Sequence, residues 1–549
     1  MKCLIVVAFT FVLAGTVIIG QDPPAEPEIP ANVLHETFDA REGEPPCALR
    51  KHAEGHAPEI KDGSLRLLSG DGGENNSAAF PLHVKGEHRQ IKAEVVFAMG
   101  KGGRGLSFML LNTAHFADAG AAFYLYKARG FPDEPTPKEP EWDEPNLWGS
   151  FALALDTHNP PTDDPFNKWG NIHKREQREL SLHFDGREIA NRFVAIDFVN
   201  SQACVLALQV EFVTGGAEVT VGVGGQAVYD RHFIPHMLPY ESRAAMGAFG
   251  PDGGVCSVDS VHVEWNKPAK ASPGALTLQA FRSTWCKRGT VEREVELLPA
   301  DVEFERVVMT LRLRPMVERD EWDRLGHVWI WDGDTRYELA RILTPFMLWG
   351  ASYEYVCDVT NFAHLLSGAR KIGVGLGGNV GNGFTFDLEF SYYRRPADVA
   401  ALPRVVGVAN VWSGNAHFNQ ADSVAKTFGK RTVGVPDGAK RALLRICVTG
   451  HGSLEFHPLT RTVKIGAKEY TDPLRTVDCY LNPWRPQFGT WKYDRAGWGP
   501  GSFGRVWEID ITEHLKPGEA LQLEYTSEAY ESKDWAQHCI ESQVIFYGQ

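Results

Sequence analysis

The sequence has no excess of positive charge, no paired metal-binding cysteines and no long hydrophobic run after its first twenty residues. Lys and Arg number 56 against 70 Asp and Glu, which gives a net charge of −14 over 549 residues. A surface of this sign repels a phosphate backbone, so we expect no nucleic-acid partner. The nine Cys form no CxxC pair and no Cys/His cluster with zinc spacing, which argues against a structural zinc site.

The first twenty residues have the pattern of a secretory signal peptide. Lys2 precedes an apolar run over residues 4–19, which is too short to span a bilayer comfortably. An uncleaved anchor is the alternative. We expect a mature chain that starts near Gln21, is secreted or periplasmic, and has no membrane span. Export permits disulfide bonds among the other eight Cys, but each half of the chain has an odd number, so at least one thiol is free or pairs between domains.

Two Pro-rich segments divide the chain. Four Pro and three acids within residues 22–30 predict a linker over residues 21–34, and a second linker is expected over residues 267–274. Short alternating apolar runs with Gly or Asp turns fill the rest, without long amphipathic helical patterns, as is typical of all-β sandwiches. We predict three consecutive β-sandwiches over residues 35–266, 275–400 and 401–549. Strands are expected at residues 90–98, 205–212, 219–223, 307–313, 327–331, 371–375, 384–390, 441–448, 461–465 and 506–511.

The densest cluster of chemically active side chains lies just before the strand expected at residues 327–331. Residues 318–324 contain four carboxylates, two Arg and one Trp. From composition alone, a solvated charged turn is the more common explanation of such a run. The cluster becomes informative only together with segments that follow it in the sequence.

Five segments of the second half together resemble the peptide-N-glycosidase F family. They are, in chain order, residues 320–324, 341–346, 365–368, 482–483 and 494–501. The resemblance covers residues 275–549 and implies two side-by-side eight-stranded jelly rolls. It also implies an amidase that needs no cofactor, acts as a monomer, and removes N-linked glycans from glycoproteins or glycopeptides. The reaction hydrolyses the side-chain amide of the glycosylated Asn and leaves Asp.

The resemblance assigns roles to individual residues. Asp323 stands at the position of the family's central carboxylate and would act as the base for water. Glu455 would face Asp323 across the interface between the rolls and bind the first sugar or orient the water. Arg495 would supply positive charge at the site, and Arg324 is the second candidate for that role.

Three further residues are expected to bind substrate, although an indole in a β-sandwich is more often part of the core. They are Trp322, Trp498 and Asp320. The sequence departs from the family at Gly375, where the family has a third carboxylate, and the family's Cys pairs around the active-site loops are missing. The alternative is therefore a non-catalytic carbohydrate-binding protein on the same scaffold. Copper monooxygenases share the two-roll architecture, but the second half has no HxH or His-x-Met pair to bind copper.

The first sandwich resembles concanavalin A-like jelly rolls in its size and in one segment. Residues 151–159 resemble the legume-lectin strand that ends in metal ligands, and Asp156, Asn159 and Asp164 could hold Ca²⁺. A polar Pro-rich loop without metal is the alternative, since Ala154 replaces an acid of the lectin pattern. A concave face with aromatic side chains can also bind sugars without metal. The aromatic residues around this loop are Trp142, Trp148 and Trp169.

Overall fold

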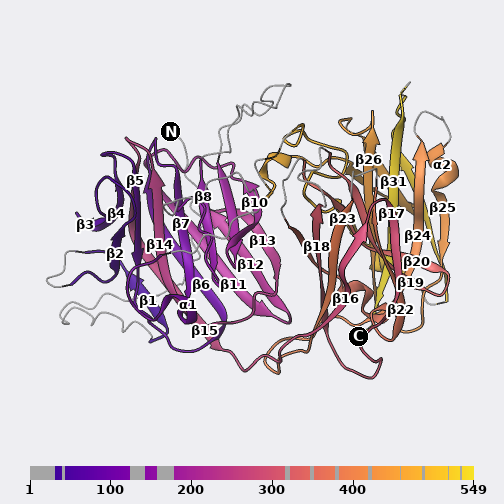
Figure 1. Cartoon of the computed structure of the whole chain (residues 1–549), viewed down its shortest axis with the longest axis horizontal. Helices are drawn as coiled ribbons and strands as arrows, with labels where there is room; N and C mark the ends of the chain where they lie inside the picture. Colours follow the sequence, from indigo (N-terminus) through magenta and orange to yellow (C-terminus); the bar gives the residue numbers. More distant parts are fainter. Residues whose placement is uncertain are drawn as a thin grey trace, which may run out of the picture.

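The computed structural model describes residues 31–39, 44–123, 142–157, 178–315, 322–346, 352–377, 383–417, 423–457, 459–484, 487, 489–516, 518–531 and 534–548. Within these ranges the chain forms three β-sandwiches one after another, as predicted (Figure 1). The two α-helices, α1 (Thr113–Phe116) and α2 (Ser423–Thr427), have four and five residues. None of the helices in the described ranges is long and apolar enough to cross a membrane.

The first sandwich packs an eight-stranded sheet against a seven-stranded sheet. Its strands are β1 (Val33–Glu36), β2 (Ala48–Lys51), β3 (Glu59–Lys61), β4 (Ser64–Ser69), β5 (Glu74–Ala79), β6 (His88–Met99), β7 (Gly105–Asn112), β8 (Phe151–Asp156), β9 (Glu179–Phe184), β10 (Arg187–Phe193), β11 (Ala203–Val213), β12 (Gly216–Val223), β13 (Gln226–Pro235), β14 (Ser242–Gly250) and β15 (Val255–Pro268). The sheet orders are β13-β12-β11-β6-β15-β4-β3, with β1 beside β15, and β10-β9-β8-β7-β14-β5-β2. β1 therefore begins inside the expected first linker, and β15 continues into the second.

Two eight-stranded rolls follow. The first contains β16 (Leu276–Cys286), β17 (Gly289–Glu296), β18 (Arg306–Pro315), β19 (Leu325–Asp332), β20 (Thr335–Leu343), β21 (Tyr353–Asp358), the 3₁₀-helix η1 (Thr360–Leu365), β22 (Ala369–Leu376) and β23 (Phe384–Tyr393). The second contains β24 (Val405–His417), β25 (Gly429–Val433), β26 (Arg441–Gly452), β27 (Thr460–Ile465), β28 (Lys468–Pro473), η2 (Cys479–Leu481), β29 (Val506–Asp510), η3 (Thr512–His514), β30 (Leu521–Ser527) and β31 (Ala536–Tyr547). Each roll packs two four-stranded sheets together: β16-β23-β18-β21 on β17-β22-β19-β20, and β24-β31-β26-β29 on β25-β30-β27-β28.

All ten strands expected from alternating apolar runs are present. The reason is the two-residue period of a strand, which places every second side chain on the face that is buried inside the sandwich. In β26, for example, Leu444, Ile446 and Val448 point into the core of the second roll. The intervening residues of β26 point away from that core, toward the first roll.

The rolls are joined by a buried guanidinium. Arg341 of β20 donates a hydrogen bond from Nη1 to Thr449 Oγ1 of β26 (3.1 Å) and another to the Cys539 carbonyl of β31 (2.8 Å). Its Nε donates to Glu338 Oε1 (3.1 Å), and both side chains are 1% exposed. Because a buried charge is costly unless it is paired, this contact fixes how the two rolls dock.

We predict that Arg341→Met destabilises the protein strongly. The substitution leaves the Glu338 carboxylate buried without its guanidinium, a change that typically costs about 3–5 kcal/mol. The measurement is the free energy of unfolding in denaturant. Arg441→Met is the matched control, since Arg441 pairs with Asp510 at the surface with side chains 46% and 55% exposed, and such a pair contributes less than about 1 kcal/mol. Equal losses in the two variants would contradict the role given to Arg341.

Candidate active site

Asp323 and Arg324 lie directly before β19. The Arg324 backbone amide donates to Thr344 Oγ1 (2.7 Å), and the Thr344 amide donates to the Arg324 carbonyl (2.9 Å). These bonds continue the pairing of β19 with β20 past the end of both strands, so the backbone beside Asp323 is held by the sheet. The Asp323 side chain is 15% exposed.

Glu455 and Arg495 come from two loops of the second roll. Glu455 lies in the turn after β26, and Arg495 lies in the segment between η2 and β29. The Ala496 amide donates to the Glu455 carbonyl (2.8 Å), and Arg495 forms an isolated β-bridge with Thr476. Backbone hydrogen bonds therefore bring these two charged side chains together.

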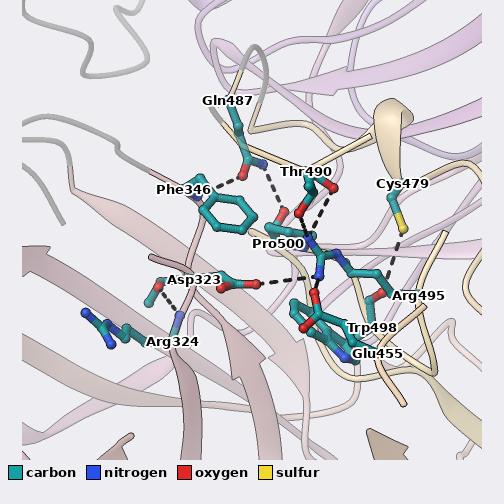
Figure 2. A network of polar contacts seen from close by, with 12 residues as sticks. Asp323, Arg324, Phe346, Glu455, Cys479, Gln487, Thr490, Arg495, Trp498 and Pro500 are labelled. Atoms are coloured by element: carbon teal, nitrogen blue, oxygen red, sulfur yellow. Dashed lines mark hydrogen bonds and ion pairs between the residues drawn. The ribbon is translucent and has the colours of Figure 1, made fainter. Parts of the chain in front are cut away.

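The Arg495 guanidinium joins the carboxylates of both rolls (Figure 2). Its Nη1 contacts Glu455 Oε1 and lies 4.0 Å from Asp323 Oδ2. Its Nη2 donates to the Thr490 hydroxyl (2.7 Å) and carbonyl (3.1 Å). Asp323, Glu455 and Arg495, three of the four residues assigned to the catalytic centre by the family resemblance, thus meet at the boundary between the rolls.

Aromatic rings surround the same guanidinium. Its central carbon lies 4.4 Å from the ring centre of Trp498, 4.8 Å from that of Phe456 and 5.6 Å from that of Phe346. Burial lowers the pKa of Arg495 to about 10, and the negative charge of Asp323 acts in the opposite direction. Arg495 therefore keeps its proton at neutral pH.

The other predicted site residues have different surroundings. Trp498 is 2% exposed and donates from Nε1 to the Gly450 carbonyl (2.8 Å), so its indole packs beneath Arg495. Trp322 is 58% exposed beside Asp323, where an incoming ligand can reach it. Arg324 points its side chain away from Arg495 in Figure 2, although it precedes β19 together with Asp323. Asp320 lies outside the described residues.

Gly375 lies on β22, paired with His327 of β19. A Cβ added to Gly375 would lie 2.8 Å from Thr290 Oγ1 and 3.5 Å from the Gly289 carbonyl. A hydroxyl and a carbonyl therefore border this space. It is not an apolar hole, and the atoms nearest to it do not include a carboxylate.

A buried acidic network beside this position was not predicted. Glu338 Oε1 bonds His327 Nδ1 (2.5 Å) as well as Arg341. Burial acts to raise the pKa of Glu338, but Arg341 and His327 outweigh it and lower the pKa to about 2. Glu541 of β31 faces this network, and burial followed by the charge of Glu338 raises its pKa to about 7. The i,i+3 pair of Glu338 and Arg341 within an apolar strand was the signal in the sequence.

The eight cysteines in the described ranges are all free, so the expected disulfide bonds are not present among them. Cys357 is half-buried and the other seven are buried. Burial raises the pKa of Cys479 to about 12, and its thiol lies against the Trp498 carbonyl at 3.7 Å. These thiols behave as packing residues, because burial disfavours the reactive thiolate.

Only some of the residues predicted to bind Ca²⁺ or sugar in the first sandwich lie within the described ranges. Asp156 is buried at the end of β8, while Asn159, Asp164 and Trp169 lie outside the described residues. No group of three His, Cys, Asp or Glu side chains suited to a metal occurs in the part of the chain that is described. Trp142 is fully buried and fills the space that a Cβ on Gly247 would occupy, at 2.5 Å. It is therefore a packing residue, and Ca²⁺ binding in this loop stays a prediction.

Residues 267–478 match the model of the family described as peptide N-acetyl-beta-D-glucosaminyl asparaginase amidase A, and residues 417–545 match that of the peptide-N-glycosidase F C-terminal domain. Peptide-N(4)-(N-acetyl-beta-D-glucosaminyl)asparagine amidase F of Elizabethkingia miricola is 26% identical over an alignment of 238 residues, and the match covers 38% of this chain and 64% of the relative. The chain thus matches less than two thirds of that relative's length.

Two solved structures align with this chain at low sequence identity. Peptide-N-glycosidase F, a glycosylasparaginase from Flavobacterium meningosepticum, matches 50% of this chain and 96% of its own, with 21% identity and a TM-score of 0.44. PNGF-II matches 83% of this chain and 100% of its own, with 12% identity and a TM-score of 0.40.

We predict that protonated Glu541 stabilises the folded protein and that this contribution is lost as the pH rises from about 4.5 to about 7. His52, His232, His451 and His538, whose pKa values burial lowers, act in the opposite direction. Folding raises the pKa of Glu541 from its ordinary 4.5 to about 7, so in this range the folded chain binds a proton that the unfolded chain has released. Glu541→Gln has no proton to release and should remove this contribution, so that the free energy of unfolding rises more steeply with pH in this window than it does in the wild type. The measurement is the free energy of unfolding against pH.

Glu519→Gln is the control for this measurement. Glu519 is an exposed acid that pairs with Lys516, with side chains 65% and 68% exposed. The control should keep the wild-type slope. An unchanged slope in Glu541→Gln would show that Glu541 is ionised throughout the window.

Proposed function

Because residues 267–545 are related to the peptide-N-glycosidase F family, we propose that this protein is an exported amidase that releases N-linked glycans. Its substrates would be glycoproteins or glycopeptides, and the bond cleaved would be the side-chain amide of the glycosylated Asn. The meeting of Asp323, Glu455 and Arg495 at the roll boundary carries the proposal. The apolar run of the first twenty residues supports export.

Asp323 is the better candidate for the general base. Glu455 contacts the Arg495 guanidinium directly, whereas the Asp323 carboxylate is 4.0 Å away from it. Direct contact with a cation makes a carboxylate a weaker proton acceptor. In this scheme Asp323 takes a proton from water while the water oxygen attacks the amide carbon.

The remaining steps follow from the charge at the site. Attack places negative charge on the amide oxygen, which a buried cation stabilises more strongly than water does. Arg495 is that cation here, and Glu455 orients it or the first sugar. The proton held by Asp323 then passes to the amide nitrogen, the C–N bond breaks, and the products are a glycosylamine and an Asp side chain.

We predict that Asp323→Asn abolishes most glycan release. Loss of a positioned base typically lowers the rate by a factor of about 10² to 10⁴. The assay follows release from a denatured glycoprotein and from a glycopeptide by mass, which detects both loss of the glycan and conversion of Asn to Asp. Asp332→Asn is the matched control, because Asp332 lies at the far end of β19, the strand that Asp323 precedes, and pairs with Arg370 at the surface.

The outcomes separate cleanly. Release by the wild type and by Asp332→Asn, but not by Asp323→Asn, supports the amidase and the role of Asp323. Equal release by all three proteins would remove Asp323 from the mechanism. Absence of release by the wild type from several glycan types would contradict the amidase proposal itself.

A further inference from the structure

A cavity of about 840 Å³ opens where the first sandwich meets the two rolls. Residues of β10 and β13 line one side, residues of β21 line another, and loops of the second roll line the third. The volume lies within the range of about 300–1,000 Å³ that small-ligand sites have. It is separate from the space beside Asp323, which is not among the lining residues.

Polar groups across the cavity are held in place by one another. Arg187 Nη1 of β10 lies 2.6 Å from Glu354 Oε1 of β21. The other oxygen of Glu354 accepts from Arg312 Nε (2.7 Å). Arg187 and Glu354 stay 33% and 24% exposed, so this pair can still offer donors and acceptors to a ligand. The pair also ties the first sandwich to the first roll.

Aromatic rings line the cavity and are fixed from behind. Trp484 packs edge-on against Tyr353 and Phe503 packs edge-on against Tyr355, both with ring centres 5.6 Å apart. The Arg306 guanidinium carbon lies 4.0 Å from the ring centre of Phe233. Rings held in this way present firm faces and edges to a ligand.

The charges of the lining are nearly balanced. Two Arg oppose three carboxylates, those of Glu188, Glu354 and Asp358. Burial lowers the pKa of the lining residue His232 to about 4, so it is neutral at physiological pH. Such a lining disfavours phosphate and sulfate groups. It suits neutral sugars, whose hydroxyls need paired donors and acceptors and whose ring faces pack on aromatic side chains.

The same loops connect this cavity to the catalytic residues. Gln487 Nε2 donates to the Trp484 carbonyl (2.6 Å), and its Oε1 accepts from the Phe346 amide (2.9 Å), the contact drawn in Figure 2. The Leu343 amide donates to the carbonyl of Ser502, another lining residue (2.9 Å). One pair of loops therefore borders the cavity on one side and the catalytic residues on the other.

We propose that this cavity binds the outer neutral sugars of the N-glycan whose linkage to Asn is positioned at Asp323. The inference rests on the proposed function and names a second part of the substrate site, built jointly by the first sandwich and the rolls. Sugars held here would keep the linked Asn near Asp323 at high effective concentration.

The experiment measures binding of a free oligomannose N-glycan to the full chain by calorimetry. Arg187→Ala removes donors from the cavity, and Ser352→Trp fills it without breaking any hydrogen bond or ion pair described above. Each should weaken binding about tenfold or more. Arg66→Ala is the matched control, since Arg66 also pairs with a carboxylate (Asp62, 2.5 Å) and is 35% exposed, but lies on β4 away from the cavity.

Each outcome decides between the two proposals. Binding that Ser352→Trp and Arg187→Ala weaken and Arg66→Ala leaves intact supports sugar binding in the cavity. If the wild type then releases no glycan, the amidase proposal and the link between the cavity and Asp323 fail, while the cavity stands as a glycan-binding site. Glycan release by the wild type without binding of the free glycan, or with equal binding by all variants, overturns the cavity and leaves the amidase standing. Binding of the deglycosylated peptide in place of the glycan, with the same sensitivity to Arg187→Ala, also overturns it.

Discussion

A single buried guanidinium sets the geometry of the candidate active site. Arg495 is fully buried, and taking a cation out of water costs several kcal/mol unless carboxylates stay close to it. Glu455 comes from the same roll as Arg495, but Asp323 comes from the other. A shift of one roll against the other would separate these charges, so the site is complete only in the docked arrangement.

Arg341 is a second buried cation at this boundary, and it reaches from the first roll to the second. Arg341 belongs to the first roll and reaches the backbone and a hydroxyl of the second, whereas Arg495 belongs to the second roll and approaches a carboxylate of the first. Apolar faces alone would tolerate sliding by a residue or two along the strands. Two reciprocal buried cations disfavour it, because a slip would take Arg341 away from Thr449 Oγ1 and the Cys539 carbonyl and would take Arg495 away from Asp323. The buried donors would then lack those acceptors.

The sequence allowed the strands and the convergence of Asp323, Glu455 and Arg495 to be anticipated, for different reasons. The strands follow from the two-residue apolar period, and the convergence follows from the family resemblance. Glu338 and Glu541 escaped prediction because they lie on outer faces of sheets, where alternating polar residues look solvent-exposed until a second roll covers them. Trp142 was expected near a sugar-binding face but is buried. Its indole fits because Gly247, which is distant in the sequence, has no side chain, and the sequence does not show that these two residues pack together.

At position 375, where the family resemblance expects a third carboxylate, the chain has a glycine and therefore no charged side chain. With two carboxylates and one guanidinium, the cluster of Asp323, Glu455 and Arg495 carries one net negative charge when all three are ionised. A third carboxylate close to Asp323 and Glu455 would be repelled by both of them. To be buried there, it would need a neighbouring cation or a bound proton. The hydroxyl of Thr290 borders this space instead. The atoms nearest to position 375 are therefore polar and uncharged.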